Sequence, residues 1–90
     1  MSNFKYLFSP IKIGSMEAAN RVWMAPHGIY NLPPASDAQI GYFEARAKGG
    51  AGVLEIANNP VTPTGIMAGM FYDLFDRNCI PKLTKLGEAI

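Results

Sequence analysis

The chain has 90 residues, of which 49% are hydrophobic, so it is long enough for one small domain with a core of its own. Eight basic and seven acidic residues are scattered along it, whereas nucleic-acid binding needs a clustered basic face. No apolar run approaches the roughly 18 residues of a membrane span, and the N-terminus has no secretory-signal pattern. The single cysteine cannot form an internal disulfide. We therefore expect a cytoplasmic protein with no nucleic-acid and no membrane partner.

The first elements in chain order are predicted to be a hairpin and a buried strand. Ile11–Ile13, a turn at Gly14 and a return toward residues 21–22 have the pattern of a small β-hairpin. Residues 22–25 are apolar throughout, which is typical of a parallel strand covered on both faces. Pro26 ends that strand, so segment 26–35 is predicted to be a loop.

A helix is predicted over the segment that follows this loop. Ser36 and Gln39 have the spacing of a capping box, which marks a helix start. Glu44 and Lys48 stand at i and i+4, where opposite charges pair on an exposed face. Gly49 and the glycine after it predict the end of the helix. Three apolar residues share one helical face: Ile40, Phe43 and Ala47.

A second strand and a second helix complete the predicted elements. Residues 53–57 form the strand, and a long loop over 60–79 leads to a helix with Pro81 in its first turn. Leu83, Leu86 and Ile90 share one face of that helix, which stops at Ile90 without a cap, as a truncated element would. The order of strand, helix, strand and helix predicts an α/β protein with parallel strands joined by right-handed crossovers.

Four separate stretches follow one another along nearly the whole chain. They are LFSPIKIG at 7–14, NRVWMAP at 20–26, YFEARAKGGAG at 42–52 and IPKLTKL at 80–86. In this order and approximate spacing they resemble the old yellow enzyme family of FMN-dependent NADH:flavin oxidoreductases. The resemblance implies that residues 1–90 are the N-terminal part of one FMN-binding (β/α)8 TIM-barrel domain, with a hairpin and the first two β–α units. Such a barrel takes about 250 residues, so it is not closed by this chain.

Ligands of α/β barrels bind at the carboxyl ends of the strands, which is where the resemblance implies a flavin wall. The cofactor-binding residues are then Ala25, Pro26, His27, Gly28 and Asn58. Asn58 departs from the alanine or glycine that is usual in the family, and Ala57 takes its place if the alignment shifts by one residue. Tyr30 stands where the ene-reductase members touch their substrate, so it is the expected substrate-binding residue.

Each of these residues also has an ordinary structural interpretation that the sequence leaves open. His27 can be a loop histidine satisfied by backbone groups, and Gly28 a turn glycine with a positive φ. Tyr30 can be a half-buried loop aromatic, and Asn58 starts an Asn-Asn-Pro run typical of a turn. Glu55 lies mid-strand among apolar residues. It either pairs with a barrel-lining Lys or Arg outside residues 1–90 or takes part in catalysis.

The activity implied by the resemblance is hydride transfer from NAD(P)H to FMN and on to an activated alkene. Gly28 stands where the trimethylamine dehydrogenase branch has a cysteine bonded to the flavin, so FMN is expected to be non-covalent. Pro26 and His27 are shared with that branch and favour a close alternative, oxidative amine demethylation. A third interpretation is a truncated, non-catalytic chain that binds no flavin.

The rest of the machinery is expected beyond residue 90. The resemblance places no catalytic residue in this chain, so the 90-residue fragment alone is expected to be inactive. No metal site is expected either, because the sequence has no second histidine and no paired cysteine to join His27. An iron–sulfur cluster is expected only in a longer parent. The expected partners are a small-molecule substrate and either a second copy of the chain or a chain that supplies the rest of the barrel.

Overall fold

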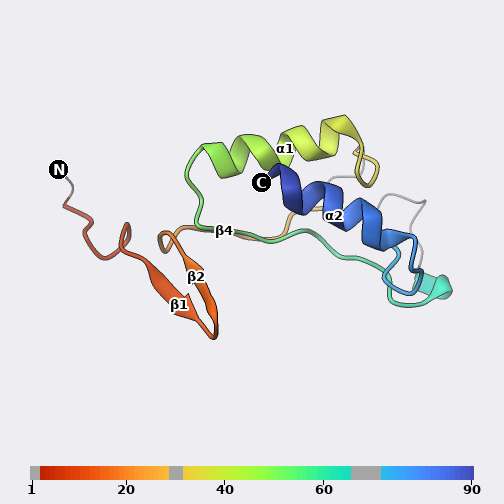
Figure 1. Ribbon diagram of the computed structural model, residues 1–90, viewed down its shortest axis with the longest axis horizontal. Coiled ribbons are helices and arrows are strands. Elements are labelled where there is room, and N and C mark those ends of the chain that lie inside the picture. Colours follow the sequence, from red (N-terminus) through yellow and green to blue (C-terminus); the bar gives the residue numbers. More distant parts are fainter. Residues whose placement is uncertain (1–2, 29–31, 66–71) are drawn as a thin grey trace.

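The protein is a mixed α/β structure in which two adjacent helices lie beside a short pair of parallel strands (Figure 1). The computed structural model describes residues 3–28, 32–65 and 72–90. Its elements are, in chain order, β1 (Ile11–Ile13), β2 (Met16–Ala18), β3 (Trp23–Met24), α1 (Asp37–Lys48), β4 (Val53–Leu54), the 3-10 turn η1 (Pro63–Gly65) and α2 (Cys79–Ala89). The predicted order of hairpin, strand, helix, strand and helix is confirmed, and the strands close no barrel within the described ranges.

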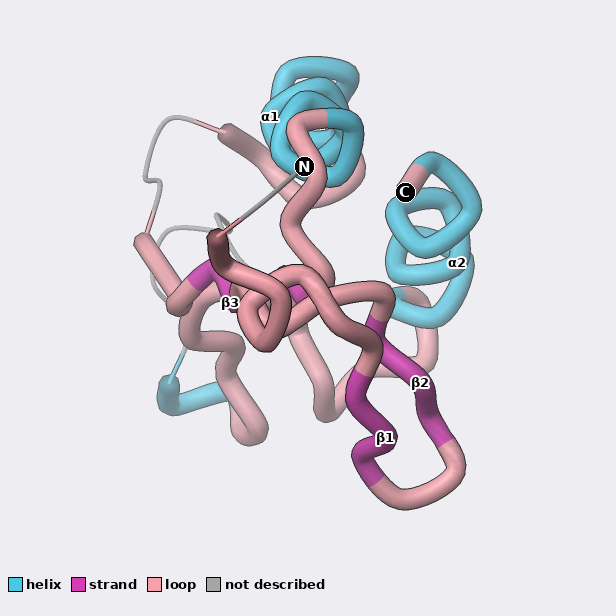
Figure 2. The backbone as a smooth tube through the Cα atoms, turned by 90° about the vertical axis from the view of Figure 1, so that its left-hand side faces the viewer, coloured by secondary structure: helices cyan, strands magenta, loops and turns pink. Residues whose placement is uncertain are grey.

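β1 and β2 form the predicted hairpin, which projects from the rest of the chain (Figure 2). They pair antiparallel, with Ile11 opposite Ala18 and Ile13 opposite Met16. Gly14 is the first of the two turn residues and has a φ of +62°, a conformation that favours glycine. The return strand ends at Ala18, before the predicted residues 21–22. Ile13 and Met16 at the turn end are exposed, whereas Ala18 at the base of the hairpin is buried.

β3 and β4 pair in parallel, as predicted, but the pairing is short. Trp23 lies opposite Val53, and the Glu55 N–H donates to the Met24 carbonyl (3.2 Å). In a parallel ladder the next bond on this side would come from the N–H two residues beyond Met24. Pro26 occupies that position and has no N–H to donate. The paired strands therefore end early, and the predicted strands over 22–25 and 53–57 are too long.

The strand pair is covered less completely than the sequence predicts. α1 packs against β4 and against α2. Trp23 in β3 is 51% exposed, and Val22 just before it is also exposed. The prediction that both faces of the first strand are covered is therefore wrong for the described part of the chain, which leaves these two large side chains in contact with solvent.

α1 begins and ends where the sequence predicts. Ser36 is its N-cap, and the Ser36 hydroxyl accepts from the Gln39 N–H (3.2 Å). The Gln39 side chain in turn accepts from the Ala35 N–H (2.9 Å) rather than from the N–H of Ser36, so the return bond of the capping box is shifted by one residue. The predicted exposed pair of Glu44 and Lys48 forms at 3.4 Å.

α2 has Pro81 in its first turn, as predicted, but its buried face differs from the expected one. Cys79 and Leu86 are buried and Leu83 is half-buried. These positions are spaced i, i+4 and i+7, so they lie on one side of the helix. Ile90 was predicted to share that side, but it follows the last helical residue and is 54% exposed. The prediction for Ile90 is therefore wrong.

The core is small and is built mainly by the two helices and the loop before α2. Its buried members are Phe43, Tyr72, Cys79 and Leu86. Half-buried side chains packed against them are Met24, Ala35, Ile40, Tyr42, Leu54, Ile56 and Leu83. The radius of gyration is 14.9 Å, whereas a compact domain of this length has about 12 Å. The extended shape shows that much of the chain lies away from this core. No helix among the described residues is both long and apolar enough to cross a membrane.

Candidate functional site

The backbone leaves β3 and β4 at the same edge of the strand pair, because the two strands run parallel. Residues 25–28 follow β3 at this edge, and residues 55–58 follow β4. The structure therefore brings the two segments of the predicted flavin wall to one end of the sheet. Ala25, Pro26, His27 and Asn58 are exposed, and Gly28 is half-buried. Tyr30 lies outside the described residues.

The segment after β3 carries backbone donors that lack a protein acceptor. The N–H groups of Ala25, His27 and Gly28 donate to no partner within the ranges that the structure describes. Backbone N–H groups at a strand end can donate to a ligand, as they do in many small-molecule and cofactor sites. A flavin ring presents carbonyl oxygens and ring nitrogens that accept hydrogen bonds, so this donor set fits it.

The segment after β4 is anchored on both sides of Asn58. The Asn59 side chain donates to the Ala57 carbonyl (2.8 Å) and accepts from the Tyr72 N–H (2.8 Å). The Pro60 carbonyl, one residue later, accepts from an N–H in the loop before α2 (2.9 Å). The Asn-Asn-Pro run is not in a turn, so the interpretation of Asn58 as a turn residue is wrong. Long-range hydrogen bonds hold this segment instead.

Glu55 lies immediately after β4 and is half-buried. Its N–H bonds to β3, but no basic side chain of the described chain forms an ion pair with its carboxylate. A half-buried carboxylate at a sheet end needs a partner or water. The expected ion pair with a cation outside residues 1–90 therefore stays a prediction, as does the alternative of a catalytic role.

Tyr72 is a residue at this end of the fold that sequence reasoning missed. It is 2% exposed, and its hydroxyl donates to the Gln39 side-chain oxygen (2.5 Å) and accepts from the Ala35 N–H (3.2 Å). Burial raises the pKa of the Tyr72 phenol, and the hydrogen bond from Ala35 opposes that rise. Tyr72 stands in a loop without hydrophobic periodicity, so the sequence contains no direct signal for its role. The one indirect signal is its hydrogen-bond partner Gln39, which stands at the capping-box position.

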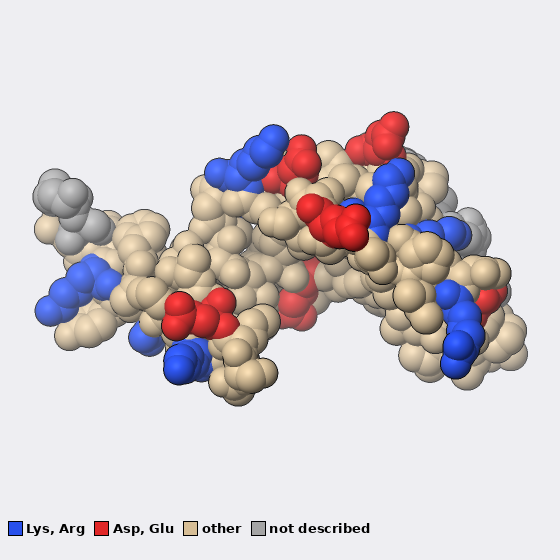
Figure 3. Space-filling view, in the orientation of Figure 1, with Lys and Arg blue, Asp and Glu red and all other residues tan. Residues whose placement is uncertain are grey.

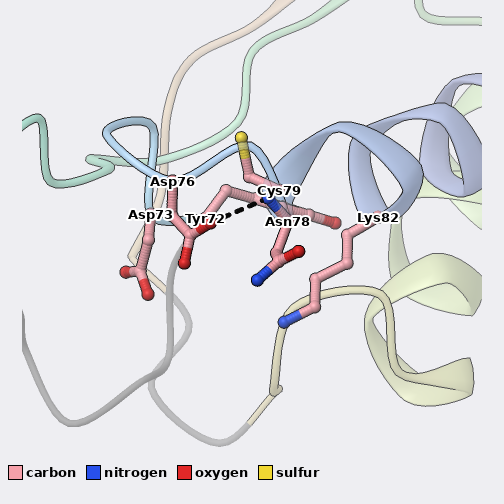
Figure 4. A pocket seen from close by; sticks show the side chains of 6 residues that line it. All are labelled: Tyr72, Asp73, Asp76, Asn78, Cys79 and Lys82. Atoms are coloured by element: carbon pink, nitrogen blue, oxygen red, sulfur yellow. Dashed lines mark hydrogen bonds between the residues drawn. The ribbon is translucent and has the colours of Figure 1, made fainter.

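A polar pocket of about 140 Å³ opens at the start of α2 (Figure 4). It is lined by Tyr72, Asp73, Asp76, Asn78, Cys79 and Lys82. The Asn78 N–H donates to the Asp76 carboxylate (2.9 Å), and the Cys79 sulfur points away from the two carboxylates. Pockets for drug-sized ligands have about 300–1,000 Å³, so this one is too small for a flavin ring. Its six lining residues include none of the predicted flavin wall.

Basic and acidic side chains are interspersed on the face shown in Figure 3. Lys and Arg lie over both the hairpin end and the helices, with Asp and Glu between them. Glu44 pairs with Lys48 (3.4 Å), and Asp37 pairs with Lys85 (3.7 Å). This face therefore lacks the clustered basic surface that a nucleic acid requires.

Residues 6–90 match the sequence model of the NADH:flavin oxidoreductase / NADH oxidase family. The chain belongs to this family. It carries the N-terminal part of an old yellow enzyme-like member, and the resemblance identified from the four sequence stretches is confirmed.

One curated protein and one solved structure match most of this chain. The chain is 34% identical over 86 residues to a metal reductase from Desulforamulus reducens, a match that covers 93% of this chain and 13% of the relative. A variant of NCR from Zymomonas mobilis matches in structure with a TM-score of 0.71 and 22% identity, over 92% of this chain and 29% of that one. At this identity the match shows the fold alone, which is that of part of a TIM-barrel enzyme. The chain spans less than a third of either protein.

Proposed function

We propose that residues 1–90 form the hairpin and the first two β–α units of a (β/α)8 barrel that binds FMN and catalyses hydride transfer. The observation that carries this proposal is the shared edge of β3 and β4, where unpaired backbone N–H groups follow one strand and Asn58 follows the other. This edge corresponds to the side on which α/β barrels bind their ligands. The family match of residues 6–90 supports a flavin as that ligand.

In this proposal the backbone N–H groups of Ala25, His27 and Gly28 hold one edge of the flavin ring, and Asn58 contacts the ring from the neighbouring strand. Bound FMN supplies the hydride chemistry, while the chain binds, orients and shields the ring. Gly28 has no thiol, and Cys79 is buried in α2 rather than at this edge. FMN is therefore proposed to be held without a covalent bond.

The proposed reaction takes a hydride from NAD(P)H and passes it through FMN to an activated alkene. A second candidate is oxidative amine demethylation, which the Pro26-His27 pair after β3 favours. The relative from Desulforamulus reducens is named a metal reductase, so a metal ion is a further electron acceptor to test. We place the enzyme in the cytoplasm, without nucleic-acid or membrane partners, with further residues or a second chain supplying the rest of the barrel.

The test is a fusion, called the completed barrel below, in which residues 1–90 replace the matching 29% of the Zymomonas mobilis chain. We expect it to purify yellow, to release FMN into the supernatant on acid precipitation, and to be bleached by NAD(P)H under anaerobic conditions. The acceptor is tested in the full-length parent, because the residues beyond 90 in the fusion come from the other protein. Stopped-flow mixing of the reduced parent with an activated alkene should reoxidise the flavin, and Fe(III) is tested as the other acceptor.

Each part of the proposal has its own contrary result in this experiment. A folded but colourless fusion contradicts the FMN site. Flavin that stays in the acid pellet contradicts non-covalent binding. Flavin of the full-length parent that is reduced by a methylated amine, and is not reoxidised by alkenes, selects the second candidate.

A further inference from the structure

Tyr72 connects two loops, the one that ends at the start of α1 and the one that follows β4. Ala35 lies at the end of the first loop, and Asn59 lies in the second. Tyr72 hydrogen-bonds to both, although it is 37 residues from Ala35 and 13 residues from Asn59 along the chain. No other residue of the described chain bonds to both of them. Tyr72 is therefore the place where the two loops are joined.

On the side of the β3 loop, Tyr72 belongs to a closed ring of hydrogen bonds. Its hydroxyl donates to Gln39 Oε1, and the Ala35 N–H donates both to that oxygen (2.9 Å) and to the Tyr72 hydroxyl (3.2 Å). Ala35 has a φ of +59°, a conformation that a non-glycine residue keeps only where its surroundings hold it. Lys85 of α2 donates to the Ala35 carbonyl (3.1 Å). The end of this loop is thus fixed by both helices and by Tyr72.

On the side of the β4 loop, Tyr72 acts through its backbone. The Tyr72 N–H donates to the Asn59 side-chain oxygen (2.8 Å), and the Asn59 side-chain nitrogen donates to the Ala57 carbonyl (2.8 Å). The Asn59 carboxamide therefore spans the peptide units on both sides of Asn58. Tyr72 therefore supports the segment around Asn58, because the Asn59 side chain that bridges this segment accepts from the Tyr72 N–H.

We propose that Tyr72 is a positioning residue for the flavin, which supports Asn58 at the flavin edge by tying Asn59 to the residues that begin α1. This inference rests on the proposed FMN site and extends it to a residue outside the two proposed wall segments, later in the connection from β4 to α2. The phenol is buried and fully engaged with Gln39 and Ala35, so it acts through the two loops and not by contact with the ring.

The substitution Tyr72→Phe in the completed barrel tests this role, because it keeps the ring packing and removes the hydroxyl alone. Tyr42→Phe is the matched control, since Tyr42 packs on the same core while its hydroxyl has no hydrogen-bond partner in the described part of the chain. We expect the FMN dissociation constant of Tyr72→Phe to rise about threefold to tenfold, with a shift of the flavin absorbance maxima. Tyr42→Phe should change neither.

A second pair of variants at Gln39 separates positioning from packing. Gln39→Glu keeps an oxygen acceptor for the Tyr72 hydroxyl and the Ala35 N–H, so it should retain most of the flavin affinity. Gln39→Leu removes the acceptor and should weaken FMN binding as Tyr72→Phe does. The double variant Tyr72→Phe/Gln39→Leu should have the same FMN affinity as whichever single variant binds FMN less tightly. Both changes break the same ring of hydrogen bonds, so their effects should not add.

The outcomes distinguish this inference from the function on which it rests. If the unsubstituted completed barrel folds without FMN, the proposed function is overturned, and this inference with it. Suppose instead that the unsubstituted barrel binds FMN and that Tyr72→Phe has a lower melting temperature. If Tyr72→Phe then has the same FMN affinity and flavin spectrum as Tyr42→Phe, only the positioning role is overturned. If Tyr72→Phe does not fold, the two Gln39 variants replace it as the test. Equal FMN affinities for Gln39→Glu and Gln39→Leu then overturn the positioning role.

Discussion

Gly52 lies so close to Asn20 that a β-carbon on Gly52 would stand 2.6 Å from the Asn20 side-chain oxygen. Asn20 cannot move aside, because its side chain accepts from the Val22 N–H (2.9 Å) and donates to the Gly50 carbonyl (2.7 Å). The Gly52 N–H itself donates to the Val22 carbonyl (2.9 Å). This contact joins the residues before β3 to those before β4, so it fixes where the parallel pair begins.

The substitution Gly52→Ala is therefore expected to destabilise the completed barrel. The added methyl group has no space, and relieving the clash should cost about 1–3 kcal/mol of unfolding free energy. Gly41→Ala is the control, because Gly41 is exposed in α1 with nothing within 4 Å of a β-carbon. It should instead gain up to about 1 kcal/mol from helix propensity. Urea unfolding measures both, and a Gly52→Ala variant that is as stable as the unsubstituted barrel would contradict the close contact.

Because Tyr72 is buried, we expect the free energy of unfolding to fall at alkaline pH. Burial raises the pKa of its phenol above the ordinary value of 10.0. The folded state then binds this proton more tightly than the unfolded state, so the stabilisation is fully present below about pH 10 and is lost as the pH rises through the folded pKa. Melting temperatures measured across this range should fall less steeply in Tyr72→Phe than in the unsubstituted completed barrel. Identical curves for the two proteins would show that Tyr72 does not titrate differently on folding.

The chain alone is expected to be aggregated, molten or dependent on a partner. Large apolar side chains remain exposed, among them Phe4, Tyr6, Phe8 and Trp23, and the parallel pair has unpaired edges. Calorimetry with light scattering at low protein concentration measures this directly. A cooperative transition from a dilute monomer of residues 1–90 would refute the expectation.

Local signals in the sequence predicted local structure correctly. Gly14 marked the hairpin turn, Ser36 the start of α1 and Pro81 the first turn of α2, because each acts through its own backbone conformation or a bond to a near neighbour. The family stretches also placed residues 25–28 and Asn58 after two strands that the structure shows to be parallel neighbours.

Features that depend on distant partners were not predictable in the same way. The strands are short because Pro26 stands at a position where the ladder needs an N–H donor. That position is known only once the register of β3 and β4 is known. The buried face of α2 depends on Cys79 meeting the core, whereas Ile90 lies past the helix end. Tyr72 gave no periodic signal, since its bonds reach residues 13 to 37 positions away.

The central claim is that the edge formed by residues 25–28 and Asn58 faces a flavin, and FMN binding by the variant Gly28→Leu of the completed barrel tests it most directly. If the ring lies against Gly28, the added side chain occupies its space, and the FMN dissociation constant should rise more than about tenfold. Gly41→Leu makes the same change on an exposed turn of α1 and should leave the affinity unaltered. Equal FMN affinities in Gly28→Leu, Gly41→Leu and the unsubstituted protein would contradict the claim.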